Sequence, residues 1–238
     1  MRAKFAIGLI ISLTLLAGGR AAGETLPLSP GLIGLDSDEG EALLFGAEAR
    51  EDYLPLSLQF VTQQNQAFCG VASMVMVLNA LNIGAPEPTA WKPFTAFNQE
   101  NFFSAKTEAV VPRAVIERMG MTLTELGGLP VSFDLASSVN HASDSTIEDF
   151  RHRARDAIAT DDSFLIINYL RSAIGQEKYG HISPLAAYDE DSDRFLILDV
   201  SRYKYPPVWV ETATLFAAMN TPDRDNENKS RGFVIVSR

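Results

Sequence analysis

The chain contains a single cysteine, Cys69, within the segment QQNQAFCGVASMVMVLNAL (residues 63–81). A thiol reacts as its thiolate, and at an unperturbed pKa near 8.5 only roughly 3% is ionised at neutral pH. The positive end of a helix and a nearby histidine both favour the thiolate. Cys69 stands at the predicted start of a helix, which supplies the first of these two features, but without a base a lone buried cysteine is more often inert than catalytic. The alternative is a small hydrophobic residue that fills the core.

His181 is the candidate base for this thiol. It follows the loop GQEKYG (residues 175–180) and begins a predicted strand, so a structural histidine at a strand end is the alternative. The other histidines have less suitable settings. His141 lies in a polar stretch, and His152 lies in the charged helical run RHRAR.

Asp199 is the predicted partner of His181. Two probable strands, HISPLAAY (181–188) and RFLILDV (194–200), flank the acidic turn DEDSD (189–193). If Tyr188 pairs with Ser192, His181 lies directly opposite Asp199 on the same face of the sheet. Asp199 also stands within an apolar strand, where an unpaired carboxylate would be costly. A carboxylate there would orient the imidazole, although a solvated charge at a strand end is the alternative.

Acyl transfer by a thiolate also needs donors for the oxyanion. The backbone N–H of Cys69 is one candidate, and the side chains of Gln63, Gln64 and Gln66 are others. The composition does not choose among these glutamines, and each of them can equally be an ordinary surface residue.

Helices and strands must bring these residues together. Apolar spacing predicts a mostly buried helix over 69–82, and Pro112 and Gly120 bound a second over 111–120. Ser145 and Glu148 form a predicted capping box for a third helix that ends near Ala159. A short helix is also expected within 38–52, after an exposed lead-in over 24–36. Strands are predicted at 163–170, 181–188, 194–200 and 232–238, which indicates an α+β fold with helices first and an antiparallel sheet second.

Composition and charge limit the remaining possibilities. Residues 1–23 have a basic start, an apolar stretch and small residues, which predicts a signal peptide and a single catalytic domain over 24–238. An uncleaved anchor is the alternative, and the expected location is periplasmic or secreted. Cleavage would change the formal net charge from −10 to −13, which argues against nucleic acid or an anionic membrane as the main partner. No stable membrane span is expected after cleavage. One cysteine cannot form an internal disulfide, and the histidines show no metal-ligand spacing.

The order of glutamine, cysteine at a helix start, histidine and carboxylate resembles the papain-like cysteine proteases. In that superfamily the oxyanion glutamine precedes the cysteine by six positions, which selects Gln63. A closer resemblance, over roughly residues 50–238, is to the phytochelatin synthase family. It rests on FVTQQNQAFCGVASMVMVLNAL, YGHISPLAAYDEDSDRFLILDVSRYKYPPVWV and SRGFVIVSR. Phe68 departs from the family pattern, which commonly has tyrosine before the nucleophile.

The resemblance implies a papain-like fold and an enzyme that acts on glutathione. Plant and yeast members carry a cysteine-rich C-terminal extension, whereas this sequence stops at Arg238 and resembles the short bacterial type. For that type the family implies cleavage of glycine through a γ-Glu-Cys thioester, mainly by hydrolysis, with weak phytochelatin synthesis. Arg231 and, less clearly, Arg171 are candidate partners for a glutathione carboxylate, and a surface arginine is the alternative for both.

The resemblance requires no cofactor, and heavy-metal ions such as cadmium would enter as thiolate complexes of the acceptor glutathione. A homodimer is one possible assembly. Two other functions stay open at this point: a general papain-like cysteine peptidase, and a non-catalytic thiol or metal-binding module.

Overall fold

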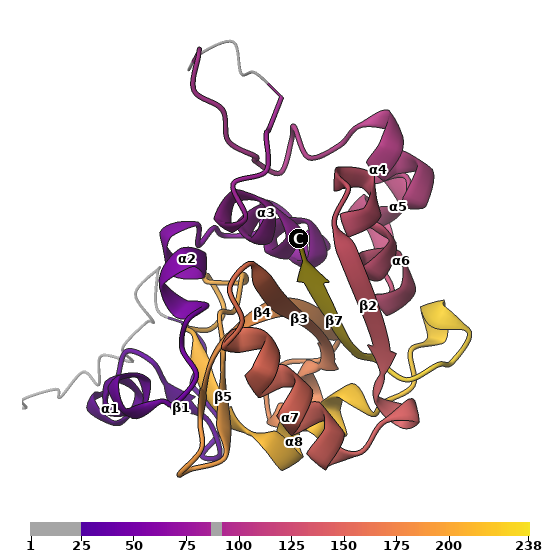
Figure 1. The fold of residues 1–238 in the computed structure, drawn as a ribbon. Coiled ribbons are helices and arrows are strands. Elements are labelled where there is room, and N and C mark those ends of the chain that lie inside the picture. The colour runs from indigo at the N-terminus through magenta and orange to yellow at the C-terminus, as the bar shows by residue number, and fades with distance from the viewer. Residues whose placement is uncertain (1–24, 87–91) are drawn as a thin grey trace, which may run out of the picture.

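A computed structural model describes residues 25–86 and 92–238 (Figure 1). The predicted signal peptide therefore lies outside the described residues. The helices are α1 (Asp38–Gly46), α2 (Tyr53–Leu58), α3 (Cys69–Ala80), α4 (Ala105–Val110), α5 (Arg113–Met119), α6 (Leu123–Gly128), α7 (Ile147–Ile158) and α8 (Thr212–Met219). The strands are β1 (Ile33–Gly34), β2 (Ala136–His141), β3 (Ser163–Leu170), β4 (Gly180–Asp189), β5 (Arg194–Ile197), β6 (Val208–Glu211) and β7 (Gly232–Ser237). Short 3₁₀ turns cover Pro130–Phe133, Ala142–Asp144, Arg171–Ile174 and Arg224–Asn226.

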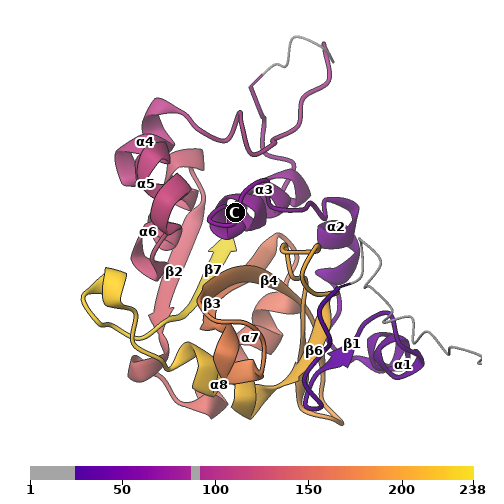
Figure 2. The ribbon, with the colours of Figure 1, turned by 180° about the vertical axis from the view of Figure 1, so that it is seen from behind.

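The strands form one sheet in the order β1-β6-β5-β4-β3-β7-β2, and every neighbouring pair is antiparallel. Helix α3 covers one face of this sheet, and α7 and α8 cover the other (Figures 1 and 2). Helices α4, α5 and α6 stand beside α3, next to β2. The α+β prediction is confirmed. None of the helices in the described part of the chain combines the length and apolar character needed to cross a membrane.

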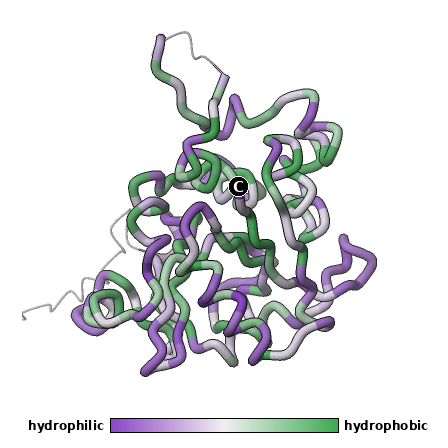
Figure 3. Tube along the Cα trace, in the orientation of Figure 1, coloured by the Kyte–Doolittle hydropathy of each residue, from purple (hydrophilic) through white to green (hydrophobic). Residues whose placement is uncertain are grey.

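Alternating side chains of the central strands build two cores. Ile166, Ile182 and Val234 pack toward α3, whereas Ile167 and Phe233 pack toward α7 and α8. Figure 3 shows hydrophobic residues concentrated in α3 and the central strands and hydrophilic ones in the outer loops. Because apolar groups cover both faces, residues in the middle of the sheet lose access to water, and polar groups there need partners.

The predicted helix at Cys69 is confirmed and begins at that residue. It ends at Ala80, two residues early, and its first ten residues are buried. The helix after Pro112 is also confirmed, and Gly120 ends it with a φ of 76°. The predicted capping box at Ser145 and Glu148 is wrong by one residue. Thr146 is the N-cap of α7 and accepts the Asp149 N–H at 3.1 Å.

The predicted register of the β4–β5 hairpin is wrong at the turn. Tyr188 pairs with Phe195 rather than Ser192, a shift of three residues, because the turn is longer than assumed. Asp189 accepts the Ser192 N–H at 2.9 Å, and Asp193 adopts a left-handed φ of 50°. These two local features occupy residues that the sequence pattern assigned to pairing.

A β-bulge between Leu185 and Ala187 then reduces the difference from the predicted register by one residue. Leu185 pairs with Ile197, so beyond Ala186 the shift is two rather than three. An even shift keeps side chains on their predicted face, whereas an odd one would reverse them. His181 and Asp199 therefore come to the same side as near-diagonal neighbours instead of directly opposed residues.

Three short strands escaped prediction. β2 consists largely of polar residues, and β1 and β6 together hold only six residues. The expected exposed lead-in over 24–36 is also wrong, because β1 within it pairs with Val208 and Trp209 of β6. Each of these segments acquires strand structure from its neighbours in the sheet and not from a pattern of its own.

Candidate active site

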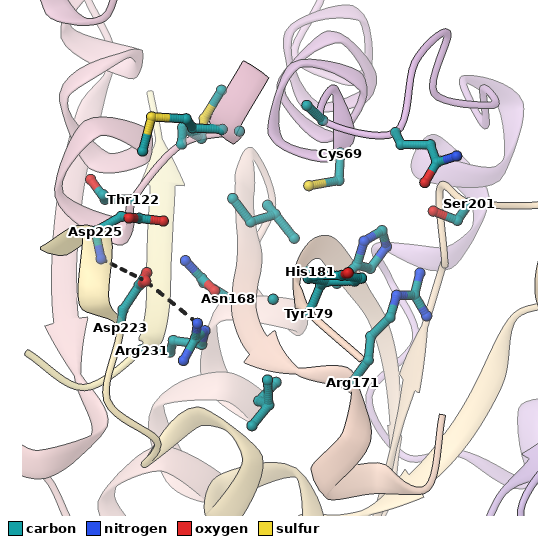
Figure 4. A pocket seen from close by; sticks show the side chains of 18 of the residues that line it. Cys69, Thr122, Asn168, Arg171, Tyr179, His181, Ser201, Asp223, Asp225 and Arg231 are labelled. Atoms are coloured by element: carbon teal, nitrogen blue, oxygen red, sulfur yellow. Dashed lines mark hydrogen bonds and ion pairs between the residues drawn. The ribbon is translucent and has the colours of Figure 1, made fainter. Parts of the chain in front are cut away.

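A cleft of about 1410 Å³ lies between the α5–α6 region, the start of α3 and the adjoining ends of β3 and β4. Its lining includes Cys69, His181 and Gln63, which are far apart in the sequence. Figure 4 shows Asn168, Asp223 and Arg231 on one side of Cys69, with His181, Arg171 and Ser201 on the other. The structure therefore brings the predicted nucleophile, base and oxyanion residue into one cavity.

Helix α3 is fixed to the strand that carries His181. The Ser73 hydroxyl lies 2.8 Å from the Cys69 carbonyl and 3.3 Å from the Ile182 carbonyl, so it bridges helix and strand. Gly70 allows a close approach on the other side, since a Cβ there would lie 2.5 Å from the sulfur of Met121. These contacts hold the first turn of α3, and the Cys69 thiol with it, at the cleft wall.

His181 is buried and held through one ring nitrogen. Its Nε2 lies 2.9 Å from Asp199 Oδ1 and 3.0 Å from Ser183 Oγ. Tyr169, the cross-strand neighbour of His181, packs edge-on against the ring at 5.8 Å. These contacts leave Nδ1 for Cys69, although no hydrogen bond joins the two within the described residues. Catalytic hydrogen bonds are often formed only once substrate binds.

Arg171 lines the cleft, but its guanidinium is paired with Asp199. It is 3% exposed, and its two terminal nitrogens lie 2.7 and 2.8 Å from the two oxygens of Asp199. It also donates to Gln176 and lies over the ring of Tyr205. The surface alternative is wrong, and a role as substrate cation fits poorly because Asp199 already occupies the guanidinium. Arg171 instead holds the carboxylate that holds His181.

Burial dominates the electrostatics of the site. Burial raises the pKa of the Cys69 thiol, against opposing contributions from the Ile182 backbone and the charge of Arg171. Burial also lowers the pKa of His181 to about 4, although Asp199 opposes that shift. Burial alone would raise the pKa of Asp199, but His181 and Arg171 hold it well below its usual range. These shifts favour the neutral forms of Cys69 and His181 at pH 7, opposite to the effect expected from the helix N-terminus.

The structure distinguishes among the three candidate glutamines. Gln63 is 4% exposed, whereas Gln64 and Gln66 are exposed. The Gln63 oxygen accepts the Ser201 hydroxyl at 2.7 Å, and its Nε2 donates to the Asn65 carbonyl at 2.8 Å and to Tyr203 Oη at 3.1 Å. Tyr203 is 46% exposed, so an oxyanion could replace it as the acceptor.

Arg231 lies in the cleft, as a substrate cation should. Its terminal nitrogens contact Pro222, Thr221 and, at 3.4 Å, Asp223, whereas Nε is buried without a partner among the described residues. Gly180 permits this position, because a Cβ there would lie 3.2 Å from Nε. The arginine is half-buried rather than a free surface residue.

Asn168 is a polar cleft residue that the sequence pattern did not reveal. Its side chain is 3% exposed and lines the cleft, yet its carboxamide has no hydrogen-bond partner within residues 25–86 and 92–238. It stands inside the strand SFLIINYL, where one polar residue in an apolar run is the signal that could have found it.

Other polar clusters lack the features of a site. His141 Nδ1 contacts the Ser230 carbonyl at 2.6 Å, and exposed His152 pairs with Asp156 at 3.1 Å. Across the described ranges, no three His, Cys, Asp or Glu side chains lie close enough together to hold a metal ion.

Comparison with known proteins identifies the family. The family model for phytochelatin synthase matches residues 23–233, nearly the whole chain. This chain belongs to the phytochelatin synthase family. Its similar relatives include a Lotus japonicus glutathione gamma-glutamylcysteinyltransferase 3, 34% identical over 88% of this chain and 43% of the relative. A Triticum aestivum glutathione gamma-glutamylcysteinyltransferase 1 is 36% identical over 88% and 41%.

A more distant member of the phytochelatin synthase family extends the comparison to fungi. The glutathione gamma-glutamylcysteinyltransferase of Schizosaccharomyces pombe is 29% identical over 86% of this chain and 48% of that protein. The chain thus spans less than half the length of these relatives.

Proposed function

We propose that this protein is a glutathione γ-glutamylcysteinyltransferase-like enzyme with a papain-like fold and Cys69 as its nucleophile. One observation carries the proposal. In a chain of the phytochelatin synthase family, Cys69 at the start of α3 shares a cleft with the buried pair His181 and Asp199. A thiol, an imidazole and a carboxylate in this arrangement are suited to acyl transfer.

In the first step the Cys69 sulfur attacks the carbonyl carbon of the Cys–Gly amide. Since thiol and imidazole are both neutral at rest, the thiol proton passes to His181 Nδ1 as the S–C bond forms. The ionised Asp199 at Nε2 then stabilises the imidazolium. The Cys69 N–H and the Gln63 Nε2 are the donors for the oxyanion. His181 returns its proton to the amide nitrogen, the C–N bond breaks and glycine leaves.

The other side of the cleft suits the γ-glutamyl group of the same substrate. That group carries an α-carboxylate and an α-ammonium. Arg231 offers its guanidinium to the carboxylate, and Asp223 offers a carboxylate to the ammonium, since both residues line the cleft. Asn168 provides a carboxamide between these residues and Cys69 (Figure 4). An ordinary peptide has a γ-glutamyl group at neither end, so these contacts favour glutathione.

Water or a second glutathione resolves the thioester. We propose that hydrolysis predominates and that transfer, which yields phytochelatin, is weaker. The enzyme requires no resident cofactor in this scheme, and cadmium acts as a thiolate complex of the acceptor. A cleaved signal peptide, a periplasmic or secreted location and a homodimer also belong to this proposal.

The decisive experiment measures glycine release and the acyl-enzyme together. Wild-type protein mixed with glutathione and rapidly quenched should gain one γ-glutamylcysteinyl group by intact mass, and peptide mapping should place it on Cys69. Cys69→Ser should lose the thioester and nearly all glycine release. Normal glycine release by Cys69→Ala would overturn the mechanism, and faster cleavage of ordinary peptides than of glutathione would favour the general peptidase.

A further inference from the structure

The loop before His181 places two unusual residues at the cleft. Lys178 and Tyr179 both line it, immediately before Gly180 and His181. Lys178 is exposed and, in the described part of the chain, forms no ion pair. Lys204, which also lines the cleft, is by contrast bound to Glu177 at 2.8 Å. Lys178 is therefore a cation available to a ligand.

Tyr179 combines exposure with a strained backbone. It is 79% exposed, and its φ of 89° is one that bulky side chains rarely adopt. Such a conformation costs of the order of 1–3 kcal/mol and tends to occur at functional sites. Its carbonyl accepts the Arg171 N–H at 3.1 Å, which fixes the loop to the end of β3. The fold thus holds an aromatic ring at the cleft despite this cost.

The chemistry of the proposed reaction identifies what the side of the cleft next to His181 must bind. His181 protonates the departing amine, so the leaving group lies on the side of the histidine, away from Arg231 and Asn168 (Figure 4). That leaving group is glycine, an amine next to a carboxylate. The acceptor amine of a second glutathione belongs to its γ-glutamyl residue and is also next to a carboxylate. Both are α-amino acids.

We propose that Lys178 and Tyr179 form a subsite for the α-amino-acid end of the leaving group and of the acceptor. The inference rests on the proposed function. The Lys178 ammonium pairs with the carboxylate, the amine faces His181, and the Tyr179 ring covers the group from the solvent side. Because one subsite serves both partners, free glycine is itself an acceptor. Its amine attacks the thioester, the C–N bond forms, the C–S bond breaks, and the amine proton passes through His181 to the Cys69 sulfur.

The test follows exchange of isotope-labelled glycine into unlabelled glutathione by mass spectrometry, with labelled glycinamide as the matched acceptor that lacks the carboxylate. The wild-type ratio of glycine to glycinamide incorporation should fall about fivefold in Lys178→Met, the upper range for an exposed ion pair. Lys106→Met, which removes an exposed lysine on α4 outside the cleft, should leave the ratio unchanged.

Tyr179→Gly and Tyr179→Ala separate the ring from the backbone. Both remove the ring, but only glycine tolerates the left-handed φ, so Tyr179→Gly should be the more stable in urea. Both should raise the glycine concentration for half-maximal exchange by similar factors. If Tyr179→Gly has the wild-type glycine concentration for half-maximal exchange and Tyr179→Ala does not, the ring has no part in binding.

The outcomes distinguish the two proposals. A wild-type protein that releases no glycine from glutathione overturns the proposed function and this subsite with it. A protein that releases glycine normally but incorporates none, or whose glycine preference survives Lys178→Met, overturns the subsite alone.

Discussion

Ser201 donates its hydroxyl to Gln63 Oε1 at 2.7 Å, across 138 residues of sequence. The backbone N–H of the same serine donates to Asp199 Oδ1 at 2.8 Å. The carboxamide proposed for the oxyanion and the carboxylate behind His181 are therefore held by one residue. All three residues are buried, so Ser201 links the positions of these two groups through hydrogen bonds shielded from water.

Gln63→Ala should reduce kcat for glycine release by about 100- to 1000-fold, the effect of losing one oxyanion donor. The affinity for glutathione should change little, because the donor acts in the transition state. Gln64→Ala is the matched control, since that neighbouring side chain is exposed, and it should retain normal turnover. Steady-state kinetics on both variants decide the matter, and equal losses would remove Gln63 from the oxyanion site.

Arg171→Gln should shift the acid limb of the kcat/KM profile to higher pH. The charge of Arg171 helps to hold the pKa of His181 down at about 4, so its removal raises the pH below which the base is protonated and inactive. The variant also loses a buried ion pair, which should cost about 3 kcal/mol in urea unfolding. Arg113→Gln, at an exposed ion pair, is the control and should change neither property. If the acid limb does not move in a folded Arg171→Gln protein, the charge of Arg171 does not lower the pKa of His181.

Alkylation of Cys69 by iodoacetamide should follow the titration of a neutral buried thiol. Burial raises its pKa, so the thiolate forms only as the pH rises above the usual value near 8.5. The rate measured without substrate should therefore be low at pH 6 to 7 and still climb above pH 9. A rate already at its maximum at pH 6 would demonstrate a resting thiolate–imidazolium pair instead.

Asp52→Asn should stabilise the protein at alkaline pH. Burial, with a smaller contribution from Glu51, raises the pKa of Asp52 to about 9, and its Oδ2 has no partner among the described residues. The folded state therefore keeps a proton that the unfolded chain releases above about pH 4. The contribution of Asp52 to the free energy of unfolding therefore falls by about 1.4 kcal/mol per pH unit as the pH rises from about 4 toward 9.

The asparagine variant lacks this titration, so its unfolding free energy should fall less between pH 6 and 9 than that of the wild type. Urea unfolding at several pH values measures the difference. Glu51→Gln, which changes only the exposed neighbouring charge, should produce a much smaller effect. Parallel curves for wild type and Asp52→Asn would show that Asp52 is ionised in the folded protein.

The sequence predicted the long, strongly patterned elements and failed where neighbours decide the structure. Helix α3 and strand β3 were found because apolar spacing covers their whole length. Strands β1 and β6 are too short, and β2 is too polar, to be recognised from their own sequences. The contact between His181 and Asp199 was expected, but from a register that the turn and bulge replaced.

The partners of the candidate site residues were harder to predict. Arg171 was a candidate substrate cation because nothing in the local sequence shows that the turn after β3 directs it inward against Asp199. The raised pKa of the Cys69 thiol depends on how deeply the fold buries a helix end, which periodicity alone cannot give. Both properties arise from long-range packing.

The irregularity between Leu185 and Ala187 has a practical consequence for engineering. It separates the catalytic end of the β4–β5 hairpin from the solvent-facing tip at Glu190 and Asp191. Residues added at that tip would lengthen the protruding loop without sliding the paired strands beneath it. Epitope tags, fluorophores or surface tethers inserted there would leave the reaction centre undisturbed.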